Sequence, residues 1–149
     1  ERYSSLESFL DSNPNQVNSN VKSIVEKAKQ YSAVDLCNEY YRITELKALT
    51  RGVFSNIDIL MVPTAGTIYR IDEVAADPVN LNTNMGYYTY YANILQLSAI
   101  AVPAAIREDG LPFGVCFLAG PQCDASLAAL GSKWQQSTNL LLGDNAGFR

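Results

Sequence analysis

Apolar residues recur at every third or fourth position through the first third of the chain, which is the period of an amphipathic helix. This pattern predicts one helix within residues 1–10, ended by the sequence SNPN, and a second helix that begins near Val17. A third and longer helix opens with Ser32 and Asp35, which resemble a capping pair, and should end near Gly52. Residues 1–52 are therefore predicted to be helical.

The pattern changes beyond this point, where short apolar runs predict strands. The run IDILMVP at 57–63 fits a strand buried on both faces, and SAIAVPAAI at 98–106 and FGVCFLAG at 113–120 form a candidate hairpin around REDGLP. A final helix capped by Asp124 should pack on this sheet through Leu127, Leu130 and Trp134. We expect an α/β fold with helices packed on a mixed sheet, and three strands make an incomplete sheet for 149 residues.

A long polar segment, residues 63–96, separates the first two predicted strands. It is rich in Gly, Thr, Asn, Asp and Tyr, and irregular loops of this length are uncommon and often functional. Ligands bind beyond the carboxyl ends of strands in α/β sheets, so the turn at 63–67 should form a wall of a pocket. Thr64 and Tyr69 are the candidate pocket residues, unless they only satisfy backbone groups of the loop. The remaining tyrosines suit either an interface or the core, and these are Tyr87, Tyr88, Tyr90 and Tyr91.

The composition excludes several classes of function. The chain has no histidine, so it cannot hold a Ser-His-Asp or Cys-His site by itself, and no metal site is predicted. A formal charge of -4 without a cluster of Lys and Arg argues against nucleic acid and anionic membranes as partners. No apolar run approaches the roughly 20 residues that span a bilayer. Three cysteines without a CxxC pair suit a reducing compartment, and we expect a cytoplasmic protein.

Three motifs carry a resemblance to a known family. Asp-x-Leu-x-x-Pro-Thr stands at 58–64, an Asn precedes a strand that reaches Pro at 93–103, and Gly-Leu-Pro-x-Gly stands at 110–114. Together with the segment EVAADPVNLN, they resemble the C-terminal half of the amidase signature family, and within it the allophanate hydrolases, including those fused into fungal urea amidolyase. The resemblance covers nearly all of residues 1–149 and implies a partial amidase-signature fold whose N-terminal strands are missing, with helices in 1–52 and strands, pocket loop and final helix in 53–149.

The resemblance implies a chemistry that needs no histidine. Amidases of this family use a serine nucleophile, a second serine and a lysine base, and allophanate hydrolases release ammonia and carbon dioxide without a cofactor. The Gly-Ser-Ser-Gly segment that carries both serines does not occur here, and the adjacent Ser4 and Ser5 lack flanking glycines. No catalytic residue is therefore assigned to this chain, which should be inactive alone. Arg2 aligns with a family arginine that binds the substrate carboxylate, the alternative being an ordinary surface arginine.

The same resemblance implies partners. These are the small substrate allophanate, the upstream half of the amidase domain, a second copy in a homodimer, and a urea carboxylase region, which would itself need ATP and biotin. The chain enters a helix at Glu1 without an initiator Met, so it looks like a piece of a longer protein. Two alternatives remain. One is another amidase-signature enzyme such as one of the amidotransferases, against which EVAADPVNLN argues; the other is a non-catalytic truncated subunit that binds a partner through its open sheet edge.

Overall fold

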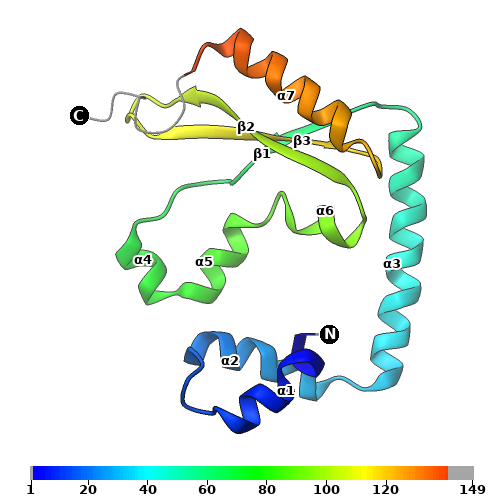
Figure 1. Cartoon of the computed structure of the whole chain (residues 1–149), viewed down its shortest axis with the longest axis vertical. Coiled ribbons are helices and arrows are strands. Elements are labelled where there is room, and N and C mark those ends of the chain that lie inside the picture. The colour runs from blue at the N-terminus through cyan, green and yellow to red at the C-terminus, as the bar shows by residue number, and fades with distance from the viewer. Residues whose placement is uncertain (1, 141–149) are drawn as a thin grey trace. The chain divides into compact units, whose positions relative to one another are not determined.

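The structure is a computed structural model that describes residues 2–140, and the chain divides into two compact units, Glu1–Arg42 and Ile43–Arg149. The first unit contains α1 (Arg2–Ser12), α2 (Ser19–Glu26) and the 3-10 helix η1 (Lys27–Gln30) (Figure 1). The first helix ends before Pro14, as the sequence predicts. Asn18 caps the second, because its side-chain oxygen accepts a hydrogen bond from the Asn20 N–H at 3.0 Å. Leu10 and Val25 are the buried side chains of these helices.

The long helix α3 (Ala33–Phe54) confirms the predicted capping pair. The backbone N–H and the hydroxyl of Ser32 donate to the Asp35 carboxylate at 2.8 and 2.7 Å, and the Asp35 N–H donates to the Ser32 hydroxyl at 3.1 Å. These bonds from the Ser32 backbone and side chain favour the ionised carboxylate and hold the pKa of Asp35 below its usual value. The helix ends at Phe54, slightly beyond the predicted end near Gly52.

The second unit contains a three-stranded sheet in the order β1 (Leu60–Pro63), β3 (Pro112–Ala119), β2 (Ser98–Ile106). The predicted hairpin is confirmed, since β2 and β3 pair antiparallel through a turn in which Gly110 has a φ of 81°. Strand β1 also pairs antiparallel with β3, so the parallel pairs of a mixed sheet do not occur among these three strands. Helices beside a sheet confirm the α/β class.

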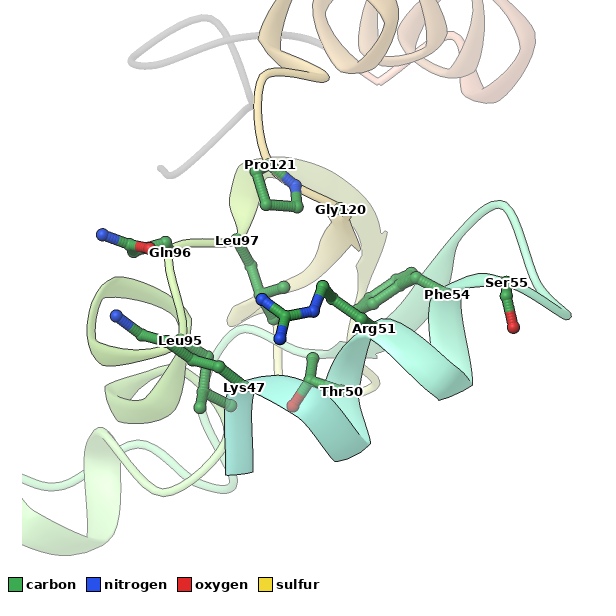
Figure 2. A pocket seen from close by; sticks show the side chains of 10 residues that line it. All are labelled: Lys47, Thr50, Arg51, Phe54, Ser55, Leu95, Gln96, Leu97, Gly120 and Pro121. Carbon is green, nitrogen blue, oxygen red and sulfur yellow. The ribbon is translucent and has the colours of Figure 1, made fainter. Parts of the chain in front are cut away.

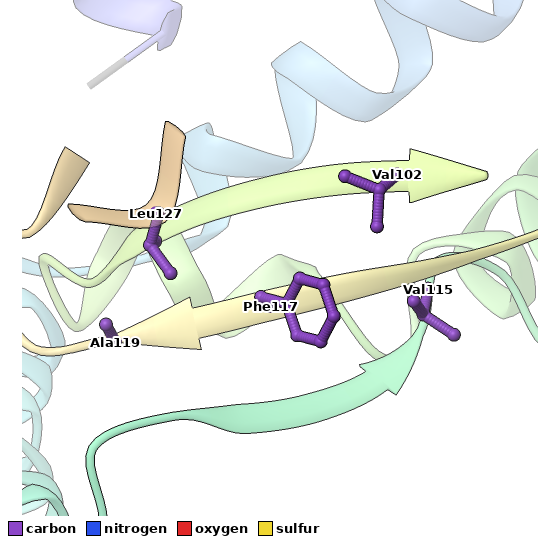
Figure 3. Packing of buried hydrophobic residues seen from close by; sticks show 5 residues of the cluster. All are labelled: Val102, Val115, Phe117, Ala119 and Leu127. Atoms are coloured by element: carbon purple, nitrogen blue, oxygen red, sulfur yellow. The ribbon is translucent and has the colours of Figure 1, made fainter. Parts of the chain in front are cut away.

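One helix, α7 (Asp124–Thr138), covers a face of this sheet and forms the core with it (Figure 1). Figure 3 shows the buried cluster, which consists of Val102, Val115, Phe117, Ala119 and Leu127. Gly131 allows the close approach, because an added Cβ would lie 2.8 Å from Ile100 Cδ1. The Trp134 indole packs edge-on against Phe117 and donates to the Pro103 carbonyl at 2.8 Å, next to a bulge in β2. The predicted packing face of α7 is therefore confirmed.

Two local predictions are wrong. In the run at 57–63 only Leu60–Pro63 form a strand, and Met61 is 56% exposed, because β1 is an edge strand of the described sheet. Asp124 does not cap α7, since Cys123 occupies that position. Instead Asp124 accepts a hydrogen bond at 3.1 Å from the buried Ser98 hydroxyl, which itself accepts from the Cys123 N–H at 2.9 Å. The Asp124 carboxylate therefore supplies the hydrogen-bond acceptor that the buried Ser98 hydroxyl needs.

The segment after β1 is not an irregular loop, which corrects the sequence prediction. It contains the short helices α4 (Ile71–Ala76), α5 (Pro78–Met85) and α6 (Tyr90–Ile94). Local caps explain them: the Glu73 carboxylate accepts from the Arg70 N–H at 2.8 Å, and Asp77 accepts from the Asn80 N–H at 3.3 Å. Pro78 begins α5, where its missing N–H costs nothing. No helix within residues 2–140 is long and apolar enough to cross a bilayer.

Candidate substrate pocket

The turn that follows β1 lines a cavity of about 430 Å³. Residues 64–68 form one side of this cavity, and the opposite side comes from Arg107 and residues 112–114 at the hairpin end. The hydrogen-bonded pairing of β1 with β3 brings these two sequence segments together. The cavity therefore lies at the carboxyl end of β1, where the sequence predicts a pocket.

Thr64 is fixed at the base of this turn. Its N–H donates to the Gly114 carbonyl at 3.0 Å, which continues the strand pairing by one residue. Its hydroxyl oxygen is buried and has no hydrogen-bond partner among the described residues. Gly114 leaves space for this hydroxyl, because an added Cβ would lie 3.1 Å from the Thr64 oxygen. A buried hydroxyl without a partner is costly, so this one is available to a ligand or to another part of the protein.

Tyr69 lies beyond the turn and is half-buried. Its hydroxyl accepts a hydrogen bond from the Asn84 amide at 3.3 Å, which links the end of the turn to α5. Tyr69 is not among the residues that line the cavity beside Thr64. Thr64 therefore lines the cavity. Tyr69 lies outside it and helps to fix the turn through its hydrogen bond with Asn84.

Arg2 belongs to the first unit, where it is the first residue of α1 and is exposed. Its carbonyl accepts a hydrogen bond from the Ser5 hydroxyl at 3.0 Å. Thr64 and Tyr69 belong to the second unit. The role of Arg2 in binding a carboxylate stays a prediction.

The tyrosines near α6 divide between packing and exposure. Tyr88 is half-buried, and its ring lies against Gly66 in the pocket turn, where an added Cβ would be 3.5 Å away. Burial, and then the neighbouring Cys116, raise the pKa of Tyr91. Tyr87 is 73% exposed and meets Tyr88 edge-to-face at 5.2 Å between ring centres. Tyr90, also exposed, donates to the Asn82 carbonyl at 2.9 Å. Tyr88 and Tyr91 are therefore the packed members of this group, whereas Tyr87 and Tyr90 are exposed.

Two residues that line the cavity, Arg107 and Phe113, were not predicted from the sequence. Arg107 lines it and forms an ion pair with Asp109 at 2.8 Å, across the hairpin turn REDGLP. Phe113 supplies an apolar ring to the same wall. The turn sequence indicates where these residues lie along the chain, but only strand pairing shows that they face Thr64. No cluster of three metal-ligating side chains occurs in the part of the chain that the structure describes.

Cys116 is a small buried residue on β3. The thiol is buried, and burial raises its pKa, so it remains in the neutral form that a core favours. Cys116 alternates along the strand with Val115 and Phe117, whose side chains face α7. It therefore belongs to the face of the sheet opposite α7.

Comparisons with known proteins agree with the resemblance seen in the motifs. Urea amidolyase of Saccharomyces cerevisiae is 37% identical over 139 residues, which are 92% of this chain and 8% of that protein. The solved structure of an allophanate hydrolase from Kluyveromyces lactis matches with a TM-score of 0.85 and 30% identity over 91% of this chain and 22% of that one. A glutamyl-tRNA(Gln) amidotransferase subunit from Chlamydia trachomatis serovar L2 is 29% identical over 90 residues, 60% of this chain and 18% of that protein.

These matches cover most of this chain but only a small part of each relative. The sequence agrees with urea amidolyase over 92% of this chain, and the fold agrees with the allophanate hydrolase over 91% of it. The family model named Amidase matches residues 6–127, from α1 into the first turn of α7. The chain therefore belongs to the Amidase family.

Proposed function

We propose that this chain is part of an amidase that hydrolyses allophanate to ammonia and carbon dioxide in urea degradation. The observation that carries the proposal is its likeness to the Kluyveromyces lactis allophanate hydrolase, with a TM-score of 0.85 over 91% of the chain. The match to urea amidolyase is longer and closer than that to the amidotransferase, at 37% over 139 residues against 29% over 90 residues. This difference favours allophanate as the substrate over a tRNA-linked amide.

In this proposal the chain supplies pocket walls and binding groups. The serine pair and the lysine base come from residues outside it, since no Gly-Ser-Ser-Gly segment occurs among its 149 residues. Thr64 offers its unpartnered hydroxyl to the amide end of the substrate, and Tyr69 holds the turn that carries Thr64. Arg2 binds the carboxylate end, because a guanidinium pairs with a planar carboxylate through two parallel hydrogen bonds.

We also propose that the enzyme is a cytoplasmic homodimer that carries a urea carboxylase region. Three free thiols, Cys37, Cys116 and Cys123, are consistent with work in the reducing cytoplasm. A urea carboxylase region on the same polypeptide would deliver allophanate, in line with the match to urea amidolyase. The exposed Tyr87 and its neighbours offer aromatic surface for a homodimer contact.

Ammonia release by the complete enzyme tests the substrate. We expect release from allophanate without ATP or a metal ion, and none from glutamine. Release from glutamine that depends on ATP and a charged tRNA would instead indicate an amidotransferase. Absence of release from every amide, by a correctly folded complete protein, would leave the non-catalytic alternative.

The substitution Arg2→Lys tests the carboxylate site. The KM for allophanate should rise about tenfold with little change in kcat, because the carboxylate is bound in both the ground state and the transition state. Arg42→Lys is the matched control, since Arg42 is an exposed arginine that pairs with Glu39 at 3.7 Å. An unchanged KM in Arg2→Lys would remove Arg2 from the site.

A further inference from the structure

A second cavity lies at the other end of β3 from Thr64. It has a volume of about 330 Å³ and lies between the C-terminal half of α3, the chain just before β2 and the chain just after β3 (Figure 2). Ser98 at the start of β2 pairs with Ala119 at the end of β3, whereas Thr64 bonds with Gly114 near its beginning. All of its lining residues belong to the second unit.

Two cations, Lys47 and Arg51, line this cavity. Lys47 and Arg51 are four residues apart on α3, so they share one face of the helix. Figure 2 shows the Arg51 guanidinium pointing into the cavity toward Leu97, while the Lys47 side chain extends past Leu95 toward Gln96. None of the ten lining residues is acidic, and neither cation forms an ion pair with any residue that the structure describes. Two like charges at this spacing repel each other unless an anion joins them.

Lys47 is half-buried at this cavity, whereas Arg51 is exposed. Apolar side chains cover much of the lining, and these are Phe54, Leu95, Leu97 and Pro121. These apolar walls lower the dielectric screening chiefly around Lys47, because water screens the exposed Arg51 guanidinium. The Thr50 and Ser55 hydroxyls donate to the Leu46 and Gly52 carbonyls at 2.7 and 2.8 Å. The side-chain donors left for an anion are those of Lys47, Arg51 and the Gln96 amide.

The wall at Gln96 is held in an uncommon backbone conformation. Gln96 has a φ of 59°, in the left-handed region that residues with a side chain seldom adopt. Two backbone bonds maintain it, from the Gln96 N–H to the Asn93 carbonyl at 3.0 Å and from the Leu97 N–H to the Ala92 carbonyl at 2.9 Å. Strained residues of this kind occur where a binding wall must keep its shape.

We propose that this cavity binds a small oxyanion, a carboxylate or phosphate compound, between Arg51 and Lys47. The guanidinium can hold two oxygens in parallel, and the ammonium adds a point charge from the side of Gln96. Arg51 lies in the last turn of α3, where a cation also stabilises the helix end. Lys47 lies about two turns inside the helix, so the helix end does not account for its position.

Calorimetric titration of the complete protein with inorganic phosphate and with succinate tests this site. We expect saturable binding of at least one of these anions, weakened by added NaCl because the interaction is electrostatic. Lys47→Gln and Arg51→Gln should each lower the affinity about tenfold, the typical effect of losing one charge-assisted bond. Lys133→Gln is the matched control, because Lys133 is an exposed lysine on α7 outside the cavity.

Two outcomes would overturn the proposal. The first is no saturable binding of either anion, and the second is equal affinity in Lys47→Gln and Lys133→Gln. The first outcome has a distinct form, in which Lys47→Gln also lowers the thermal midpoint of the protein and Lys133→Gln does not. That result would indicate that an acidic side chain of the same protein, and not a free anion, pairs with Lys47 in the cavity. Since Arg51→Gln also removes a cation from a helix end, Lys47→Gln is the variant on which the decision rests.

Discussion

Two regions of the second unit are stabilised in different ways. In the hairpin layer, formed by β2, β3 and α7, apolar side chains interlock, and Leu127 and Phe117 are almost completely buried. In the pocket segment, residues 64–97, none of the three short helices has a buried residue. Side-chain hydrogen bonds connect its parts instead, such as the bond from the Asn84 amide on α5 to the Tyr69 hydroxyl. Within this unit, all the hydrophobic side chains that the structure describes as buried belong to the layer, whereas the segment positions the pocket. Regions with few buried contacts open first, and binding elements are often drawn from them.

The largest effect should come from truncating the core of the hairpin layer. Leu127→Ala removes a side chain that is 2% exposed, and should lower the free energy of unfolding by about 2–5 kcal/mol. Ile71→Ala in the pocket segment is the control, because Ile71 is 91% exposed and its loss should cost under about 0.5 kcal/mol. Thermal or denaturant unfolding of both variants measures the difference. Equal losses would contradict the division between layer and segment.

Thr64→Val separates function from stability at the junction of the two regions. The hydroxyl has no partner among the described residues, so its removal should leave the unfolding midpoint unchanged or slightly higher. If it binds substrate, kcat/KM for allophanate should fall about tenfold, by the loss of one hydrogen bond in the pocket. Thr83→Val is the control, since the exposed Thr83 hydroxyl only donates to the Val79 carbonyl. Unchanged kinetics in Thr64→Val would remove this residue from the pocket.

A smaller effect is expected at the start of α5. Asp77 accepts hydrogen bonds from the N–H and from the amide side chain of Asn80, and Asp77→Ala should cost about 0.5–2 kcal/mol. Asp77→Asn keeps an acceptor at the same position and should recover most of this loss. The recovery, read from the unfolding curves of the two variants, distinguishes a cap from general packing. Equal destabilisation by Ala and Asn would argue against the cap.

The smallest effect belongs to Tyr69→Phe, which removes the bond from Asn84 at 3.3 Å. The free energy of unfolding should fall by no more than about 1 kcal/mol, since the bond is exposed. Hydrogen exchange should quicken in residues 64–85 and stay unchanged in β2 and β3, because only the pocket segment depends on this link. Tyr31→Phe, at an exposed tyrosine of the first unit, should alter neither rate. Faster exchange throughout the sheet would show that the two regions are not separable.

The same contrast explains which parts of the fold the sequence predicts. The run at 98–106 coincides with β2, and the spacing of Leu127, Leu130 and Trp134 identifies the packed face of α7. These elements are long enough for their apolar pattern to repeat. Helices α4, α5 and α6 are five to eight residues long, too short for a repeat, so their signal lies in caps such as Asp77 followed by Pro78.

The candidate sites show a similar limit. The motif places Thr64 after a strand, but the unpartnered state of its hydroxyl depends on Gly114, fifty residues further along the chain. Lys47 and Arg51 are indistinguishable in the sequence from ordinary solvated helix residues. Their significance comes from the apolar walls that β2, β3 and the chain around them bring to the same face of α3. Long-range pairing of strands supplies this information, and local patterns do not contain it.

Trp134 gives the hairpin layer an optical reporter. It is the only tryptophan in the 149 residues, and its indole lies between the Phe117 ring and the Pro103 carbonyl, where α7 meets the bulge of β2. Emission from this indole therefore depends on the docking of α7 on the sheet. A change that lifts α7 exposes the ring to water and shifts its emission to longer wavelength, whereas opening of the pocket segment alone leaves the spectrum unchanged.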